Sequence, residues 1–576
     1  MVRTAIPNRH FYFSTLPDTF KEMNMKRVKR LLTRIVILPL IFSCCFAADP
    51  TQSLSEIEAQ MLALLNQHPD QSMHYKLLNS RLREKNALWK PFQEVLENVS
   101  EAEYMRLTEL IVEKSIFELQ ESVNSGDLSY EELVTFYIYR IRNMESDSDR
   151  FINGVISLNP NAIERARQLD EIQLNSEGRD KNSIFGIPVL LKDNIGFEGI
   201  PTTAGAAALI ENHTTNAFIT NRLVEQGAIV LGKANLSEWA YFFCRDCPSG
   251  YSAVGGQTLN PYGRLDFGTG GSSAGSGASI AANYAAVAVG SETSGSILSP
   301  SSANSLVGLK PTTGSLSRSG VVPISSTLDT VGPMGRSVAD VVTLFNAMVG
   351  FDEEDPAMPR LSEDLRLVIR QAPTDNGTFG ILTTYADNMQ YQNALRLLSE
   401  NGFNLQEVDF LNERHPRFSE FLGAEMKRDL VSYLQKYASA SVEIDSVSTL
   451  QEFNLLDPEM RAPYGQELVD LMADLDLSEE ELEDLGAELR AWGQTSLDRL
   501  FSRSGIDILF GVNNHQASIA ALANYPALTL PMGYDEDGRP VGLTLIAPSF
   551  QEQLLVDVGL NIERILAARK APANYR

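Results

Sequence analysis

Two glycine- and serine-rich segments, close together along the chain, most restrict what this sequence can fold into. The first is residues 267–277, Phe-Gly-Thr-Gly-Gly-Ser-Ser-Ala-Gly-Ser-Gly, and the small residues 278–286 follow it. Glycines at this density permit positive φ angles and close backbone approach, and the alanine-rich continuation favours a tightly packed helix. The second is residues 287–297, in which a short apolar run leads into Gly-Ser-Glu-Thr-Ser-Gly-Ser-Ile. This order indicates a loop entering a helix, and then a strand entering a turn that carries serine.

The turn after the second apolar run has a chemical use. Successive main-chain N–H groups in such a turn converge on one point, which is what stabilisation of a tetrahedral oxyanion requires. Ser296 would then lie beside its own oxyanion hole and act as a nucleophile. Taken alone, the segment also fits an ordinary loop of serine, threonine and glycine.

Two other classes of site compete for the first segment. A nucleotide-binding loop needs either Gly-Lys-Ser/Thr or GxGxxG, and residues 267–277 satisfy neither pattern, which argues against phosphate binding. Residues 271–275 do match GxSxG, the nucleophile elbow of α/β-hydrolases, with Ser273 as nucleophile. That elbow needs a hydrophobic strand directly before it and a later histidine. Residues 260–269 are instead rich in turn formers, and only His415 and His515 lie downstream.

A lysine ends the apolar run Gly-Ile-Pro-Val-Leu-Leu-Lys at residues 186–192. If this run is a core strand, burial disfavours the charged form of Lys192 and lowers its pKa, which would make it a competent base. A solvated lysine after a strand is the commoner arrangement. The residues around Lys192 do not by themselves decide between the two.

Together, the three segments resemble the amidase signature family in their order, spacing and composition, over nearly the whole region from about 180 to 340. The interval from Ser272 to Ser296 agrees with that family's interval between relay serine and nucleophile. The resemblance implies Lys192 as base, Ser272 in a cis peptide as bridge, and Ser296 as the acyl-forming nucleophile. It also implies that the oxyanion hole consists of the main-chain amides of Thr293, Ser294, Gly295 and Ser296.

Two positions depart from the family pattern. Ser294 stands where the family commonly has glycine, which is expected to reshape the turn slightly, and Leu298 stands where many members have arginine, which is expected to change the charge of the pocket. Residues 306–312, 326–334 and 525–531 look like further family blocks, so the resemblance covers most of the chain after about residue 115. Residues 290–296 and 255–261 look most like the peptide amidases, which remove the C-terminal amide of peptides.

The resemblance implies an enzyme that hydrolyses carboxamide C–N bonds through a Ser-Ser-Lys triad and an acyl-enzyme. Its substrate would be a small-molecule or peptide amide, and no metal or organic cofactor is needed. The alternatives are an amidotransferase A-type subunit, against which export and acidity argue, and a catalytically inactive binding protein, against which the presence of all three catalytic residues argues. The formal charge of −26 repels phosphate backbones, so nucleic acid is not an expected partner. No oligomeric state is predicted.

A leader is predicted at residues 1–48. Five basic residues between positions 26 and 34 precede the apolar run 35–42 and the small residues 44–48, which is the order of a secretory signal peptide. The apolar run is short for a membrane span, and an N-terminal anchor or a lipid on Cys44 is the alternative. Some 22 residues precede Met23. We therefore expect translation to begin at Met23 or Met25, and the protein to be exported, either to the periplasm or as a secreted protein.

Two of the four cysteines, Cys244 and Cys247, lie beyond this leader. Such a CxxC pair suits a redox site, half a zinc site or a small disulfide. No second CxxC or nearby histidine completes a zinc site. Export favours a local disulfide over two free thiols.

Changes in composition along the chain predict its organisation. Residues 49–147 are helix-periodic and predict an N-terminal helical extension, whereas residues 148–570 predict the catalytic domain, in which β-branched runs alternate with small residues. A helical insert is expected at about 380–500, including a helix opened by a capping box at Ser478. Strands are expected again at residues 506–510, 526–530 and 541–546. We therefore predict an α/β fold, a single large domain with a mixed β-sheet core surrounded by helices.

Overall fold

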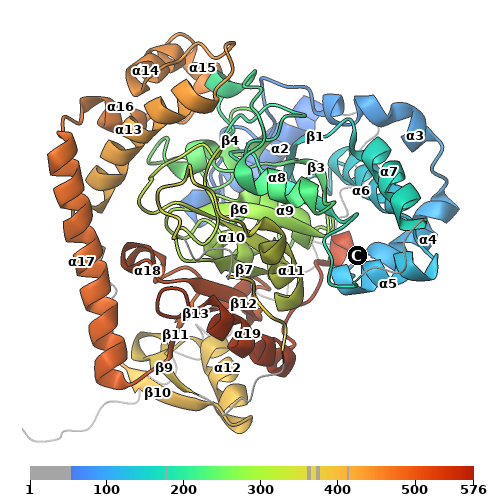
Figure 1. Cartoon of the computed structure of the whole chain (residues 1–576). Coiled ribbons are helices and arrows are strands. Elements are labelled where there is room, and N and C mark those ends of the chain that lie inside the picture. Colours follow the sequence, from blue (N-terminus) through green and yellow to red (C-terminus); the bar gives the residue numbers. More distant parts are fainter. Residues whose placement is uncertain (1–53, 175–179, 360–364, 371–376, 411–413) are drawn as a thin grey trace, which may run out of the picture. The chain divides into compact units, whose positions relative to one another are not determined.

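The computed structural model describes residues 54–174, 180–359, 365–370, 377–410 and 414–576. Residues Ser55 to Arg576 form one unit (Figure 1). The predicted leader, residues 1–48, lies outside the described residues. Within the described ranges, no helix has the length and apolar character needed to cross a membrane.

The core of the unit is one mixed sheet of 11 strands (Figure 1). In sheet order the strands are β1 (Val155–Leu158), β3 (Ile229–Ala234), β2 (Pro188–Lys192), β6 (Val287–Glu292), β8 (Thr330–Gly335), β7 (Val307–Lys310), β12 (Ala527–Tyr534), β13 (Pro540–Ile546), β11 (Ile508–Val512), β9 (Thr378–Leu382) and β10 (Asn404–Val408). Strands β3, β2 and β6 are parallel, as are β11, β9 and β10, and the other neighbouring pairs are antiparallel. A separate antiparallel pair joins β4 (Tyr251–Ser252) to β5 (Gly256–Gln257).

The helices fall into three groups along the chain. The N-terminal extension contains α2 (Leu54–Leu65), α3 (Gln93–Glu97), α4 (Glu101–Ile111), α5 (Ile116–Ser125) and α6 (Tyr130–Glu145). Helices in contact with the sheet or its loops are α7 (Ala162–Leu174), α8 (Phe218–Glu225), α9 (Ala274–Ala281), α10 (Leu298–Ala303), α11 (Val338–Met348), α12 (Met389–Glu400), α18 (Ala517–Ala523) and α19 (Glu552–Leu566). The helical insert contains α13 (Phe418–Tyr437), α14 (Val447–Leu455), α15 (Pro458–Arg461), α16 (Glu467–Asp474) and the long α17 (Glu479–Ser504).

Local sequence accounts for several of these elements. Helix α17 begins with the predicted capping box, in which Ser478 and Glu481 each bond the other's main-chain N–H. Strands β2, β3 and β6 are buried along their whole length, as expected for parallel strands that are covered on both faces. The strands predicted after residue 506 are present as β11, β12 and β13, and they continue the same sheet.

The predicted start of the helical insert, at about residue 380, is wrong. Strand β10 lies within the predicted insert, and with β9 it forms the edge of the main sheet (Figure 1). The reason is that β10 is an edge strand whose side chains are mostly exposed or half-buried. It therefore lacks the apolar alternation that marks a strand in sequence. The helices of the insert begin at Phe418.

The topology places two predicted segments at one edge of the sheet. Strands β2 and β6 are parallel neighbours, with Leu191 opposite Val289. Because the carboxyl ends of parallel strands meet at the same edge, Lys192 at the end of β2 lies near the turn that follows β6. Helix α9 follows the loop 267–273 and packs against β6 and β2, which adds the first glycine-rich segment to the same place.

Candidate active site

Lys192 is fully buried at the end of β2. Its Nζ lies 2.8 Å from Ser272 Oγ, 2.9 Å from Ser291 Oγ and 3.1 Å from the Ser291 carbonyl oxygen. Desolvation lowers the pKa of Lys192 to about 7, although the negative charges of Asp329 and Glu292 act in the opposite direction. A neutral amine has two N–H donors and one lone pair. If the two oxygens of Ser291 take both donors of the neutral amine, its lone pair is left for the hydroxyl proton of Ser272.

Ser272 is held rigidly on the other side of this contact. The Gly271–Ser272 peptide bond is cis, as the family resemblance implies. The Ser272 carbonyl accepts a hydrogen bond of 3.0 Å from the main-chain N–H of Ser237. Gly271 has no room for a side chain, because a Cβ there would lie 2.5 Å from Ser249 Oγ and 2.7 Å from Ser237 Oγ. The dense glycines of this loop therefore allow close approach of the Ser237–Gly250 segment behind the relay serine.

The turn Thr293–Ser296 joins β6 to α10. Gly295 has a φ of 91°, and a Cβ there would lie 2.8 Å from Asn514 Nδ2, so both conformation and space call for glycine. The buried carboxylate of Glu292 accepts hydrogen bonds from Ile297 N at 2.7 Å and Leu298 N at 3.0 Å. Among the hydrogen bonds of the described residues, none is donated by the main-chain N–H of residues 294, 295 or 296. These amides remain available for an oxyanion.

Ser296 is close to Ser272 in the fold. Its carbonyl accepts a hydrogen bond of 3.2 Å from the main-chain N–H of Ser273, the neighbour of Ser272. The hydrogen bonds of the described residues do not include one between the two hydroxyls of Ser272 and Ser296. Such catalytic hydrogen bonds often tighten only once substrate is bound. Ser296 is 9% exposed, so access to it is narrow.

Two side-chain hydrogen bonds connect the turn to two segments that lie later in the sequence. The Thr293 hydroxyl donates to Asp329, whose other carboxylate oxygen accepts from Ile324 N at 2.8 Å and Ser325 N at 2.9 Å. Ser294 Oγ lies 2.9 Å from Ser518 Oγ on α18. Asp329 stands in no motif that predicts a role for it. Its position within the family-like block 326–334 is the only signal that could have pointed to it.

The two departures from the family pattern have simple structural outcomes. Ser294 does not adopt a positive φ, so a side chain is accommodated there, and its hydroxyl binds Ser518. Leu298 is 1% exposed and packs in an apolar cluster with Ala517 and Ile519. It is not among the residues that line the cavity beside the site.

The hydroxyl of Ser273, the alternative nucleophile, forms hydrogen bonds with the main chain of Ser291. Its side chain is fully buried, its hydroxyl donates to the Ser291 carbonyl oxygen at 3.1 Å, and the same hydroxyl accepts from Ser291 N at 3.3 Å. The strand that an elbow requires is not found among the described residues directly before Gly271, where residues 260–270 form turns and coil. Both observations argue against the nucleophile-elbow alternative.

Thr293→Val is expected to lower kcat by about 10- to 100-fold with little change in KM. Valine keeps the shape and the main-chain N–H of residue 293, but it leaves a half-buried Asp329 oxygen without its hydroxyl donor and loosens the turn. Both constants should be measured with one amide substrate. Thr293→Ser restores the hydroxyl and should retain most of the wild-type kcat. A raised KM with unchanged kcat would instead show that Thr293 contacts the substrate.

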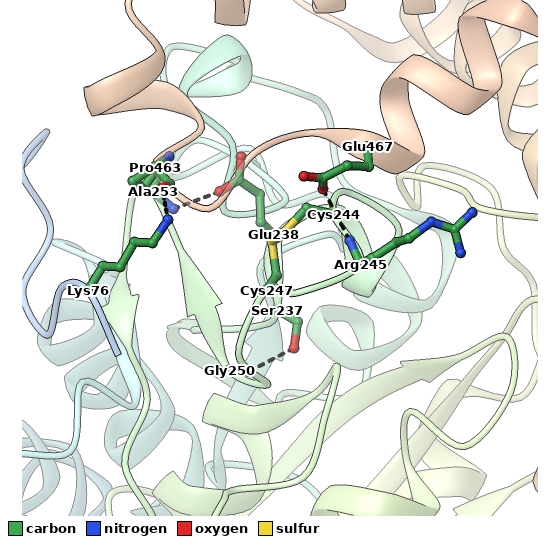
Figure 2. Close-up of a disulfide and its surroundings, with 10 residues drawn as sticks. All are labelled: Lys76, Ser237, Glu238, Cys244, Arg245, Cys247, Gly250, Ala253, Pro463 and Glu467. Carbon is green, nitrogen blue, oxygen red and sulfur yellow. Dashed lines mark hydrogen bonds between the residues drawn. A yellow bond between two sulfur atoms is a disulfide. The ribbon is translucent and has the colours of Figure 1, made fainter. Parts of the chain in front are cut away.

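The segment that supports Ser272 contains the pair Cys244 and Cys247, which form a disulfide with a Cα–Cα distance of 5.4 Å (Figure 2). Figure 2 also shows Gly250 N donating to Ser237 Oγ at 2.9 Å, and Arg245 N donating to Glu467 of the insert at 3.4 Å. The disulfide therefore lies between the insert and the residues that contact the relay serine.

Removing the disulfide with Cys244→Ala and Cys247→Ala together is expected to lower the free energy of unfolding by about 2 kcal/mol. This is the chain-entropy value for closing so short a loop. Urea unfolding with and without reductant measures it. The wild type should lose stability in reductant, whereas the double variant should not respond. Equal stability of the two proteins without reductant would contradict the expectation.

Comparisons with known proteins identify the family of this chain. The family described as Amidase matches residues 132–487. A probable amidase of Arabidopsis thaliana is 32% identical over 500 residues, which cover 83% of this chain and 96% of that protein. The structure of an amidase family protein from Bacillus anthracis str. Ames aligns with a TM-score of 0.79 and 33% identity, over 86% of this chain and 99% of that chain. The peptide amidase from Stenotrophomonas maltophilia aligns with a TM-score of 0.73 and 33% identity, over 80% of this chain and 98% of that chain. The chain therefore belongs to the amidase signature family and is a hydrolase that acts on amide C–N bonds.

Proposed function

We propose that this amidase cleaves carboxamides through an acyl-enzyme on Ser296, with Ser272 as proton relay and Lys192 as base. The observation that carries the proposal is the contact of 2.8 Å between Lys192 Nζ and Ser272 Oγ, made by a fully buried lysine. Burial keeps much of this amine neutral near pH 7, so it has a lone pair to offer. A serine is a weak nucleophile unless an adjacent base takes its proton.

The chemistry follows from the positions of the groups. Lys192 accepts the proton of Ser272, and Ser272 accepts the proton of Ser296. At the same time, Ser296 Oγ attacks the carbonyl carbon of the substrate. The main-chain amides of the turn Thr293–Ser296 bind the oxygen that becomes negative. The proton returns through Ser272 to the nitrogen of the leaving group, and the C–N bond breaks. Water then attacks the ester on Ser296, with the same groups taking its proton, and releases the carboxylic acid.

The substrate class that we propose is the C-terminal amide of peptides. Support comes from the resemblance of residues 255–261 and 290–296 to the peptide amidases, and from the alignment with the peptide amidase above. Ammonia or amine release across a panel of peptide amides, fatty amides and aryl amides tests it. Turnover of peptide amides at a kcat/KM at least about tenfold above the others is the expected result. A preference for fatty or aryl amides would overturn the substrate class and leave the amidase assignment standing.

The same panel of amides distinguishes a hydrolase from an amidotransferase subunit, which would pass its ammonia to an acceptor. The purified chain alone is expected to release ammonia into solution. If it releases ammonia only in the presence of a partner subunit and a tRNA-bound acceptor, it would be an amidotransferase subunit instead.

We also propose that the protein is exported. The charge pattern of residues 26–48 supports export, and a disulfide between Cys244 and Cys247 suits an oxidising compartment. Sequencing the N-terminus of the protein recovered from cell fractions tests the proposal. A mature protein that keeps residues 26–44 and is recovered from the cytosol would overturn it.

A further inference from the structure

A cavity of about 230 Å³ lies between residues 318–331 and helix α13, beside the candidate active site. Its inner end is formed by Asn194, Ser291 and Thr293, residues that are 2%, 7% and 7% exposed. Its mouth is formed by Glu354 and Lys436, whose side chains are 65% and 48% exposed. Ser291 binds Lys192, and Thr293 begins the oxyanion turn. The cavity therefore runs from the surface to the partners of the catalytic base, and the proposed mechanism assigns it no role.

The charged groups of this cavity are unbalanced. The carboxylates that line it are Asp329, Glu354, Asp355 and Asp429, and the cations that line it are Arg318 and Lys436. Both cations are already engaged, because Arg318 Nε lies 2.9 Å from Asp355 and Lys436 Nζ lies 2.6 Å from Glu354. Asp429 is paired with Arg428 at 2.7 Å.

Asp329 is the exception among these carboxylates. It accepts hydrogen bonds only from the Thr293 hydroxyl and the N–H groups of Ile324 and Ser325, and it takes part in no ion pair among the described residues. The cavity thus carries a surplus of negative charge. Its unpaired carboxylate, Asp329, lies beside Thr293 at the inner end.

One residue of the inner end, Asn194, carries a buried hydrogen-bond acceptor without a donor. Asn194 Nδ2 donates to Ser291 Oγ at 2.9 Å and to the Val322 carbonyl oxygen at 3.3 Å. Because a carbonyl only accepts, this second contact fixes which way the amide group points. Asn194 Oδ1 is then buried with no hydrogen-bond partner. Such an atom is costly unless something that enters the site donates to it.

The walls of the cavity indicate what kind of donor would fit. Val322, Ile324 and Val331 supply apolar surface, and the rings of Tyr433 and Tyr437 also line the cavity. Aromatic rings attract cations, and the apolar residues suit a short alkyl chain. Negative charge, a free acceptor and apolar walls together select a small organic cation with N–H groups. We propose that this cavity is a binding subsite for a protonated primary amine, with Asn194 Oδ1 and the Asp329 carboxylate accepting its N–H groups.

The proposal rests on the proposed function only for the source of this amine. Hydrolysis of an N-alkyl amide releases a primary amine beside Lys192, and this amine is protonated in water. Hydrolysis of a C-terminal peptide amide releases ammonia, which becomes ammonium. The alternative source is an ammonium group carried by the substrate itself. Both have the same chemistry, so binding is tested first and the source second.

Binding is tested by isothermal titration of Ser296→Ala protein with propylammonium chloride at pH 8 and constant ionic strength. Ser296 is not among the cavity residues, and its removal prevents turnover, so the result does not depend on amide hydrolysis. At this pH propylamine is protonated, and Asp329, whose pKa desolvation raises to about 6, is ionised. Saturable binding of one propylammonium is expected. Tetramethylammonium, which has no N–H group, should bind at least about tenfold more weakly.

Variants in the same Ser296→Ala background locate the site. Asp329→Asn and Asn194→Leu should each weaken propylammonium binding by about tenfold or more. The matched control is Asp387→Asn, which changes the net charge equally at an exposed position outside the cavity and should bind as before. Equal binding of the two cations, no saturable binding, or unchanged binding in both cavity variants would overturn the proposal. The comparison of the two cations needs no cavity variant, so it holds even if a variant fails to fold.

Steady-state kinetics of the wild type then distinguish the sources. If the released amine occupies the cavity, propylammonium inhibits turnover of every amide, including amides without a charged group. If the substrate supplies the cation, an amide with a terminal ammonium on its acyl chain has a KM at least about tenfold below its neutral isostere, and Asp329→Asn removes the difference. If propylammonium binds saturably but the wild type hydrolyses no amide, the proposed function is contradicted and the assignment of the cavity still holds.

Discussion

Ser296→Ala is expected to lower kcat for every amide that the wild type hydrolyses by about 10⁴-fold or more. Loss of the nucleophile removes the acyl-enzyme, and the remaining groups cannot form another covalent intermediate, so only binding and oxyanion stabilisation remain. The folded state should be unaffected, because the Ser296 hydroxyl makes no hydrogen bond among those of the described residues. Ammonia release under saturating substrate measures the loss.

Labelling with a covalent probe tests the role of Ser296 as nucleophile independently of the substrate. An alkyl fluorophosphonate should label the wild type once, and mass spectrometry of the digested protein should place the label on Ser296. Ser296→Ala should not be labelled. Ser273→Ala is the control, and it should still be labelled at Ser296. A label on Ser273 in the wild type would contradict the relay assignment and restore the nucleophile elbow.

Lys192→Met is expected to lower kcat/KM by about 10³-fold or more at pH 7. Methionine has a similar length and suits a buried position, but it has no lone pair that can accept the Ser272 proton. In the wild type the base must be neutral, so kcat/KM should rise with pH through the lysine pKa of about 7 and then level off. This rise should be missing from Lys192→Met. Near-normal activity of the variant at pH 7 would remove lysine as the base.

The free energy of unfolding, measured as a function of pH, shows whether Lys192→Met is folded. It also shows whether Lys192 is desolvated in the wild type. Burial lowers the pKa of Lys192 from 10.5 to about 7, so between these values the unfolded chain binds more protons than the folded chain. The free energy of unfolding of the wild type therefore gains a contribution that increases with pH across this window. The variant lacks this contribution, so its unfolding midpoint should change less with pH. An identical pH dependence in both proteins would mean that the lysine is solvated.

Local sequence was sufficient for much of the fold. The helical extension, the strand-rich blocks on either side of the insert and the capping box of α17 all follow from periodicity and capping rules that act within a few residues. Local sequence does not locate the start of the insert, because β10 is an edge strand with mostly polar side chains. Such a strand forms because it pairs with its neighbour β9, and its own pattern does not predict it.

The sequence by itself determined the family, the fold class and the three segments that meet at the site, because glycine-rich loops and an apolar run ending in lysine are local patterns. Only the tertiary structure decided how these segments are held. Thr293 meets Asp329 across 36 residues, and Ser294 meets Ser518 across 224. The unpartnered Asn194 oxygen likewise exists only because β2 and the loops packed around it exclude other donors. Such contacts depend on which distant side chains the fold brings together, and no spacing along the chain records that.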